Sequence, residues 1–455
     1  MLLGAVVAGA VEVYLAHRTS GPDGIIERRY GLLGLIGAWT AAYVVAVACV
    51  LRLPRRWAIG LVLVLAVVLR LAALAEKAPL SDDLYRYAWD GVVQTNGIDP
   101  YRYAPLAPEL AELRDPWLFP PGYELNRGTQ INRPLVRTIY PPVAEAWFAL
   151  EHLVVPLSAQ DLGYEGVGLL LDLAILAVLL AMLRDRRWVA LYALAPLPVL
   201  EAVQNAHVDA LAVLLTLGAV ALSERRRPTA AVAVLALATL VKIYPALLLP
   251  LLLRGRSGFV RGIGVFVAVC AASYLPHVLA VGTKIFGYLP GYLEEEKYGE
   301  GGRFLLLGLV GLSGAPAKLV AGLLLAALAI WALRTTLPLR ESAVRLFAGV
   351  LLVVTPVQPW YALLLLALIT LARAWWALPI TVAAYPLYFA VVLDGNGPLV
   401  GRVSYGVAAL LAVVAIRTAS ATRARHSEPA AAPPASASPD PAPELPRAPR
   451  TADRT

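Results

Sequence analysis

Long apolar runs recur along the chain and alternate with short polar stretches. Runs close to the length that crosses the hydrocarbon core of a bilayer occupy residues 31–51, 57–75, 262–280, 317–333 and 375–393. A single water-soluble core would not need so many runs of this length. The pattern therefore predicts an all-α integral membrane protein, a polytopic bundle of about 12–14 transmembrane helices.

Clusters of arginine separate these runs and orient them. Short loops on the cytoplasmic side of membrane proteins are enriched in Lys and Arg. The clusters lie at residues 52–56, 184–187, 225–227, 254–261 and 334–345. If all of them face the cytoplasm, the chain must return to the same side between each pair. Residues 76–164 then form a large first loop on the extracytoplasmic side.

Between Arg227 and Arg254 the chain must leave the cytoplasmic side and come back to it, which predicts a broken hairpin rather than one straight helix. A straight helix would place Lys242 near the bilayer centre, at a cost of about 2.5–3.5 kcal/mol on insertion scales. A hairpin with Lys242 at its outer tip avoids this cost, and Pro245 supplies the break. The same reasoning predicts a bend at residues 355–361.

These signals divide the chain into four parts. Residues 1–75 are expected to form N-terminal transmembrane helices, and residues 76–164 the extracytoplasmic loop with interfacial helices. Residues 165–418 form the main transmembrane bundle, with short outer tips and a longer loop at 277–303. Residues 419–455 are rich in Pro, Ala, Ser and charge and lack apolar periodicity, so we expect a disordered cytoplasmic tail.

Composition agrees with a membrane protein and excludes other classes. The chain of 455 residues is 59% hydrophobic and only 15% charged, whereas a soluble domain carries about 25% charged residues. The net charge of +8 does not indicate nucleic acid as a partner, because the arginines are scattered between apolar runs instead of lining one face. Cys49 and Cys270 both lie in apolar stretches, which argues against a disulfide framework and a metal site.

An acidic motif follows the apolar run at 57–75. Residues 81–91 read SDDLYRYAWDG. Adjacent carboxylates repel, so either Asp82 or Asp83 binds its proton more tightly and can act as a general base. Tyr85 and Trp89 can stack on sugar rings, and Arg86 can pair with a phosphate. The alternative is that Asp82 caps a short interfacial helix and the aromatic residues are membrane-belt residues.

Other polar residues gather at the expected outer tips. His207 and Asp209 open an apolar run, and Lys242 can reach a phosphate or extend to the interface. Arg303 ends a glycine-rich loop that suits phosphate binding, and His277 can assist a carboxylate. For these positions a helix-capping or solvated-loop role is the alternative. His207 and Asp209 point to different faces of a helix, so we do not expect them to chelate one metal.

The motifs resemble a known enzyme class. A membrane span followed by an acidic pair, then YRYAWDG at 85–91, GIDPY at 97–101 and YPP at 140–142, resembles the membrane glycosyltransferases of the C-type (GT-C) fold. Among these the chain is most similar to bacterial mannosyltransferases that take mannose from a polyprenyl phosphate. The resemblance implies a GT-C fold with a catalytic first loop. It also favours no cofactor: some GT-C enzymes need a divalent cation, and such a requirement stays an open but less favoured alternative for this chain, in which no metal site is expected.

The resemblance also implies roles for particular residues. It places the catalytic base at Asp82 or Asp83 and leaves the choice between them open. With the chemistry above, it suggests these further roles: donor phosphate binding by Lys242, Arg303 and Arg86, and acceptor or sugar binding by Tyr85, Trp89, Tyr101, His207, Asp209 and His277.

The expected activity is an inverting transfer of a sugar, mannose by resemblance, from a polyprenyl-phosphate donor to a glycolipid or cell-envelope glycan. The enzyme would lie among the lipids of a bacterial plasma membrane, crossing it several times, with its active site on the extracytoplasmic side. Two alternatives remain open. A transporter or flippase of a lipid-linked sugar would need polar groups at mid-membrane and a repeat relating two halves. A scaffold for an envelope complex would need no chemically essential outer residue.

Overall fold

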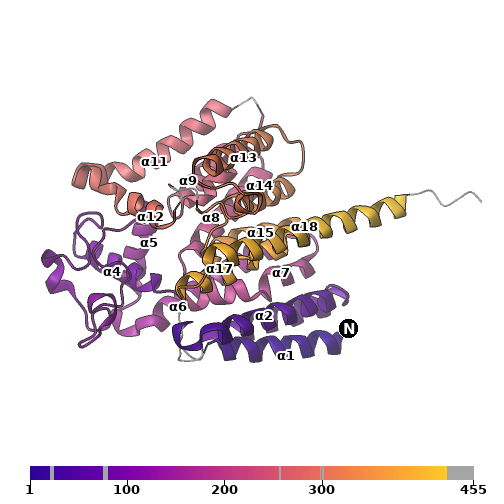
Figure 1. Ribbon diagram of the computed structural model, residues 1–455, viewed down its shortest axis with the longest axis horizontal. Helices are drawn as coiled ribbons and strands as arrows, with labels where there is room; N and C mark the ends of the chain where they lie inside the picture. The colour runs from indigo at the N-terminus through magenta and orange to yellow at the C-terminus, as the bar shows by residue number, and fades with distance from the viewer. Residues whose placement is uncertain (21–24, 75–79, 256–257, 298, 300–301, 428–455) are drawn as a thin grey trace, which may run out of the picture. The chain divides into compact units, whose positions relative to one another are not determined.

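The computed structural model describes residues 1–20, 25–74, 80–255, 258–297, 299 and 302–427, and every regular element in these ranges is a helix (Figure 1). The chain divides into two units, Met1–Val413 and Val414–Thr455. The second unit contains the end of the last helix, and the expected disordered tail falls mostly on residues 428–455, which lie outside the described ranges. The all-α fold expected from the sequence is confirmed.

The helices differ widely in length. The α-helices of the first half are α1 (Leu2–Thr19), α2 (Ile25–Val50), α3 (Arg55–Leu74), α4 (Asp83–Thr95), α5 (Pro142–Val154), α6 (Gln160–Met182), α7 (Ala190–Ala193), α8 (Asp209–Glu224) and α9 (Pro228–Thr239). Those of the second half are α10 (Leu249–Leu252), α11 (Phe259–Val281), α12 (Leu289–Glu295), α13 (Gly314–Arg334), α14 (Leu339–Val354), α15 (Ala362–Ala372), α16 (Leu378–Val382), α17 (Ala384–Val392) and α18 (Gly397–Ser427).

Short helices of other types join them. The 3-10 helices are η1 (Pro108–Leu113), η2 (Leu125–Arg127), η3 (Leu157–Ala159), η4 (Arg186–Val189), η6 (Tyr244–Leu248), η7 (Gly282–Phe286), η8 (Leu307–Val310), η9 (Pro359–Tyr361) and η10 (Trp375–Ala377). The segment η5 (Pro198–Gln204) is a π-helix.

Seven helical segments in the described ranges are long and apolar enough to cross a membrane. They are Arg28–Val50, Arg55–Leu74, Leu157–Met182, Phe259–Glu295, Gly314–Arg334, Trp375–Val392 and Gly397–Thr418. An eighth is possible if the bent pair η5 and α8 counts as one span. The number is lower than the 12–14 expected, because several expected spans are helices of 16 residues or fewer, such as α8, α9 and α14.

Large apolar side chains cover the outside of the long helices. On α11, for example, Val260 is 83% exposed and Leu279 is 79% exposed. Soluble proteins do not leave continuous apolar faces of this kind in water, whereas a lipid environment accommodates them. The arrangement is that of a multi-pass membrane protein. Inside it, the guanidinium of Arg70 on α3 and the carboxylate of Asp172 on α6 are fully buried and 2.6 Å apart, which fixes the two helices against each other.

The expected breaks are present. Helix α9 ends at Thr239, Lys242 lies in the turn, and the chain doubles back so that η6 and α10 pack against α9. Helix α14 ends at Val354, and α15 returns along it after the residues around Pro356. A third break separates η5 from α8, whose axes meet at 111°.

The segment from residue 80 to α6 forms its own small core beside the long helices. In Figure 1, α4 and α5 lie together at one end of the helices of the first unit. Tyr87 on α4 stacks on Phe148 of α5, with ring centroids 4.5 Å apart. Gly91 makes this crossing possible, because a Cβ atom there would lie 2.4 Å from the carbonyl oxygen of Phe148.

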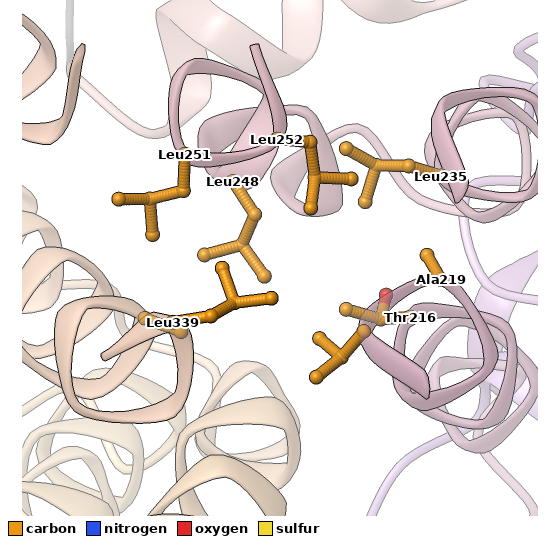
Figure 2. Close-up of a pocket in the computed structure, with 9 residues that line it drawn as sticks. Thr216, Ala219, Leu235, Leu248, Leu251, Leu252 and Leu339 are labelled. Atoms are coloured by element: carbon orange, nitrogen blue, oxygen red, sulfur yellow. The ribbon is translucent and has the colours of Figure 1, made fainter. Parts of the chain in front are cut away.

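The interior of the bundle is tightly packed. Figure 2 shows apolar side chains from α8, α9, α10 and α14 converging around one small cavity. Leu235, Leu251 and Leu339 are among its lining residues, and Thr216 supplies the polar atom. The cavity holds about 10 Å³, which is the size of one water probe. It cannot accommodate a sugar or a lipid.

Candidate active site

Asp82 and Asp83 lie directly before and at the start of α4, yet their surroundings differ. The carboxylate of Asp83 is 17% exposed, and its Oδ1 accepts a hydrogen bond from Asn132 Nδ2 at 2.7 Å. Asp82 occupies the N-cap position of α4 but its side chain makes no capping hydrogen bond, which argues against the purely capping role. Asp83 is therefore anchored, whereas Asp82 reaches solvent and is free to meet a substrate.

The electrostatics of Asp82 suit a general base. Although its side chain reaches solvent, the exclusion of water by surrounding protein atoms and, second, the negative charge of Asp83 together raise the pKa of Asp82 to about 6. A carboxyl group with such a pKa is mostly ionised at neutral pH and is a stronger base than an ordinary aspartate.

A buried histidine faces the acidic pair. His207 Nε2 lies 3.9 Å from Asp83 Oδ2, too far for a direct hydrogen bond. Its Nδ1 lies 3.2 Å from Glu201 Oε2 and 3.1 Å from the Glu201 carbonyl oxygen. With its hydrogen on Nδ1, the imidazole donates to Glu201 and turns the lone pair of Nε2 towards Asp83. The ring stacks on Trp360, with centroids 4.0 Å apart. Glu201 therefore contacts His207, His207 faces Asp83, and the solvent-accessible Asp82 is the neighbour of Asp83 in the chain.

The bend between η5 and α8 sets the position of this histidine. Ala206 has φ of +46°, a left-handed conformation that is costly for a residue with a Cβ atom. Gly168 on α6 lets the bend approach closely, because a Cβ atom there would lie 2.3 Å from the carbonyl oxygen of Ala202. π-helices are rare and occur frequently at functional sites. Backbone strain and a π-helix together therefore mark residues 198–207 as a functional segment.

Side chains of this segment and of α17 also hold the residue that precedes the acidic motif. Asn205 Oδ1 accepts a hydrogen bond from the Leu80 N–H at 2.7 Å, and Asn205 Nδ2 donates to Glu201 Oε2 at 3.2 Å. Tyr388 donates to the Leu80 carbonyl oxygen at 2.5 Å, and Tyr385 donates to Glu201 Oε1 at 2.6 Å. These bonds connect residues far apart in the chain and position the acidic pair over His207.

Lys242 and Asp209 form an ion pair on the other side of Tyr140. Lys242 Nζ lies 3.3 Å from Asp209 Oδ2 and 4.9 Å from the centroid of the Tyr140 ring. Asp209 is fully buried, whereas the Lys242 side chain is 12% exposed. Burial raises the pKa of Tyr140 well above its usual value, and the charges of Asp83 and Asp209 both raise it further. Tyr140 therefore lies within electrostatic reach of both carboxylates and links the two halves of the site.

The two aromatic residues of the acidic motif that were expected to bind a sugar lie away from the accessible surface. Tyr85 packs edge-on against Trp117, and Trp89 packs in the same manner against Phe119. Both belong to the small core beneath the loop and are less than 10% exposed. Buried rings cannot stack on a sugar at the surface, so this position does not match the expected role. The rings instead stabilise the loop through their burial.

Arg86 is also turned inward. Its Nε lies 3.0 Å from both carboxylate oxygens of Asp90, one helical turn further on, and Nη1 donates to the Val136 carbonyl oxygen at 3.2 Å. The side chain is 5% exposed. Its charge therefore neutralises a buried carboxylate, and a phosphate could reach it only after this part of the loop had opened.

The remaining predicted residues belong to two neighbouring pairs. His277 Nδ1 lies 2.8 Å from Asp99 Oδ2, and the His277 ring meets Tyr101 edge-on at 5.1 Å. Tyr101 is buried and donates to the Tyr140 carbonyl oxygen at 2.6 Å, so it supports the site without being accessible. Arg303 Nη2 lies 2.5 Å from Glu296 Oε2, so this cation is already paired.

Sequence reasoning assigned no role to Glu201, Asn132 or Trp360. Asn132 and Trp360 meet the acidic pair and His207 only through tertiary contacts, and no local pattern indicates them. Glu201 had a usable signal, since it is an acidic residue within an apolar stretch, six residues before His207. In the described part of the chain, no group of three or more His, Cys, Asp or Glu side chains is arranged to hold a metal ion.

A comparison with protein families bears on the activity of the chain. Residues 138–299 match the model of glycosyltransferase family 87, a family of GT-C-type membrane glycosyltransferases. The match covers less than half of the chain; it includes Tyr140, Glu201, His207, Asp209 and Lys242 but not the acidic pair. No curated protein and no solved structure matches the chain. The transporter alternative is not favoured, and the family match supports a glycosyltransferase embedded in a membrane.

Proposed function

We propose that the protein transfers mannose from a polyprenyl-phosphate donor to a lipid-linked or cell-envelope glycan acceptor, with inversion at the anomeric carbon. The reaction takes place on the extracytoplasmic side of a bacterial plasma membrane. The observation that carries this proposal is the cluster of an accessible carboxylate at the N-terminus of α4, an anchored second carboxylate and a buried His207–Glu201 pair.

In the proposed step, Asp82 is the general base. The acceptor hydroxyl attacks the anomeric carbon of the donor sugar from the face opposite the phosphate. Its proton passes to the Asp82 carboxylate as the new carbon–oxygen bond forms. The bond between the anomeric carbon and the phosphate oxygen breaks, and the electron pair leaves with the polyprenyl phosphate. A phosphate is a stable leaving group, so the base and nearby positive charge suffice.

Asp83 and His207 position the base and the acceptor. The hydrogen bond from Asn132 leaves Asp83 Oδ2 directed to the gap of 3.9 Å that separates it from His207 Nε2. A single water can bridge such a gap, whereas the fully buried His207 meets no sugar hydroxyl itself and acts on the acceptor through Asp83. Glu201 holds the histidine in the tautomer that presents an acceptor nitrogen. We therefore assign Asp83 and His207 to acceptor orientation.

Lys242 and Arg303 are the proposed cations for the donor phosphate. Each is paired with a carboxylate, Lys242 with Asp209 and Arg303 with Glu296. The donor phosphate is a diester with one negative charge, and both of its non-bridging oxygens can accept hydrogen bonds from a lysine or arginine that a single carboxylate holds. As the bond to the sugar breaks, the leaving polyprenyl phosphate gains a second negative charge, which these cations stabilise. Binding of the donor would then exchange one partner of each cation for another.

The test uses the purified full-length chain with radiolabelled polyprenyl-phosphate mannose and membrane extract as the source of acceptor. D82N should abolish transfer, and D83N should reduce it strongly, while both variants keep the unfolding temperature of the wild type. The exposed Glu112 offers a matched control, since E112Q removes one carboxylate from the same loop. Full transfer by D82N would refute the assigned base.

Donors carrying arabinose or glucose decide the sugar in the same assay. A donor other than mannose that is used more efficiently would overturn the assigned sugar but leave the transferase chemistry in place.

A further inference from the structure

A polar cavity lies outside the candidate active site. It has a volume of about 530 Å³ and is lined by three cations, Arg102, Arg137 and Lys284, and one carboxylate, Glu109. The lining residues come from the segment between α4 and α5, from η7, which directly follows α11, and from the two residues after η7. None of the residues assigned to the proposed transfer reaction lines it.

The charge of this cavity is available to a ligand. Arg102 donates to the Ala280 carbonyl oxygen at 3.2 Å, and Arg137 donates to the Arg102 carbonyl oxygen at 3.2 Å. Both bonds are to neutral backbone groups, and all three cations are exposed. Among the described residues, no ion pair joins any of the three to a carboxylate. Glu109 offsets only one of three positive charges, so the cavity favours an anion.

The backbone holds the two walls together at an unusually close contact. Gly287 has φ of +50°, and a Cβ atom there would lie 1.7 Å from the Thr138 carbonyl oxygen. Only a glycine permits this approach. The wall that carries Lys284 is thereby brought against the wall that carries Arg137, so the cations are gathered by the fold rather than scattered over a mobile surface.

The position of the cavity indicates what kind of anion can enter it. Lys284 follows α11 by three residues, and α11 belongs to a segment apolar enough to cross a membrane. Leu135, which lines the cavity, is 55% exposed, and Phe286, which precedes the lining residue Gly287 in the chain, is 59% exposed. Cations next to exposed apolar side chains at the end of a span are typical of contacts with lipid headgroups. The two tyrosines of the lining, Tyr103 and Tyr288, suit the same interface.

We infer that this cavity is a binding site for the phosphate of an anionic membrane lipid, with Arg102 and Arg137 as the guanidinium partners and Lys284 as a third charge. The glycerol or sugar part of the headgroup lies along Tyr103 and Tyr288, and the acyl chains leave past Leu135 towards the membrane. This site goes beyond the transfer reaction and does not depend on it.

The test measures retention of phosphatidylglycerol by the purified full-length protein in native mass spectrometry, against phosphatidylcholine at equal concentration. Wild type should prefer phosphatidylglycerol. R102Q and R137Q should each lower its retention about tenfold, as expected for the loss of one charge-assisted contact. The exposed Arg127 lies in the same loop without lining the cavity, so R127Q should retain the lipid as wild type does.

Two further variants keep the test decisive if an arginine variant folds poorly. K284Q removes a charge from the other wall and should also weaken retention. G287A keeps every charge but forces the walls apart, and it should weaken retention as well. Equal retention of the two lipids by wild type, or undiminished retention in R102Q, R137Q and K284Q, would overturn the proposal. If about 10 mM inorganic phosphate displaces the lipid, the site binds phosphate without needing the rest of the lipid, because that concentration corresponds to only weak binding of a free anion. This result would overturn the assignment to a lipid.

Discussion

The acid limb of the pH–rate profile is the sharpest test of the candidate active site. Burial and the charge of Asp83 raise the pKa of Asp82 to about 6. If Asp82 must be ionised to accept the acceptor's proton, kcat/KM follows the ionised fraction, which is about 0.9 at pH 7, about 0.5 at pH 6 and about 0.1 at pH 5. An aspartate with an ordinary pKa near 4 would still be about 90% ionised at pH 5.

Replacing Asp83 separates the two causes of this shift. In D83N the like charge is absent, so the pKa of Asp82 falls while the contribution of burial remains. The midpoint of the acid limb should therefore move to lower pH, together with a lower maximal rate because the Asn132 contact is altered. The direction of the shift distinguishes a charge effect from a general loss of structure.

The assay is the initial rate of labelled sugar transfer at subsaturating donor, from pH 4.5 to 8, with E112Q as the control for removal of a surface carboxylate. The unfolding temperature at each pH shows that the protein stays folded. A profile that stays flat down to pH 5 would contradict the assignment of Asp82 as the base. A midpoint that does not move in D83N would refute the role of Asp83 in raising the pKa.

Three other substitutions test the surroundings of the site. E201Q keeps the shape of the side chain but removes the charge that orients His207. Transfer should fall about 10- to 100-fold, as for loss of an orienting partner. The KM for the acceptor should change, while the unfolding temperature stays close to that of the wild type. K242M leaves the fully buried Asp209 without its cation and should lower the free energy of unfolding by about 3–5 kcal/mol; in K242M/D209N most of this loss should be recovered, as measured by chemical denaturation in detergent. G168A places a Cβ atom 2.3 Å from a carbonyl oxygen of the facing π-helix, so both transfer and thermal stability should decrease, whereas G166A on the same helix, where a Cβ atom meets nothing within 4 Å, should leave both unchanged.

The periodic features of this chain were predictable from the sequence. Apolar runs of bilayer length predict a multi-pass helical protein, because each helix must satisfy its backbone hydrogen bonds within itself inside a membrane. Lys242 and Pro245 predict the broken hairpin, because a lysine is costly at the bilayer centre and a proline interrupts a helix. The structure has that break. Fewer helices reach the length of a full span than the sequence suggested, because apolar composition alone does not show that helices such as α9 stop after 12 residues.

The acidic pair was also visible in the sequence, as two adjacent carboxylates at the end of an apolar run. Their unequal roles were not, because they depend on Asn132 and His207, which approach from 49 and more than 100 residues away. The sequence determines which chemical groups are present and that the chain crosses a membrane. Only the tertiary structure decides which carboxylate is anchored, which aromatic rings are buried and which cations remain open to an anion, because burial and pairing are set by side chains from distant helices.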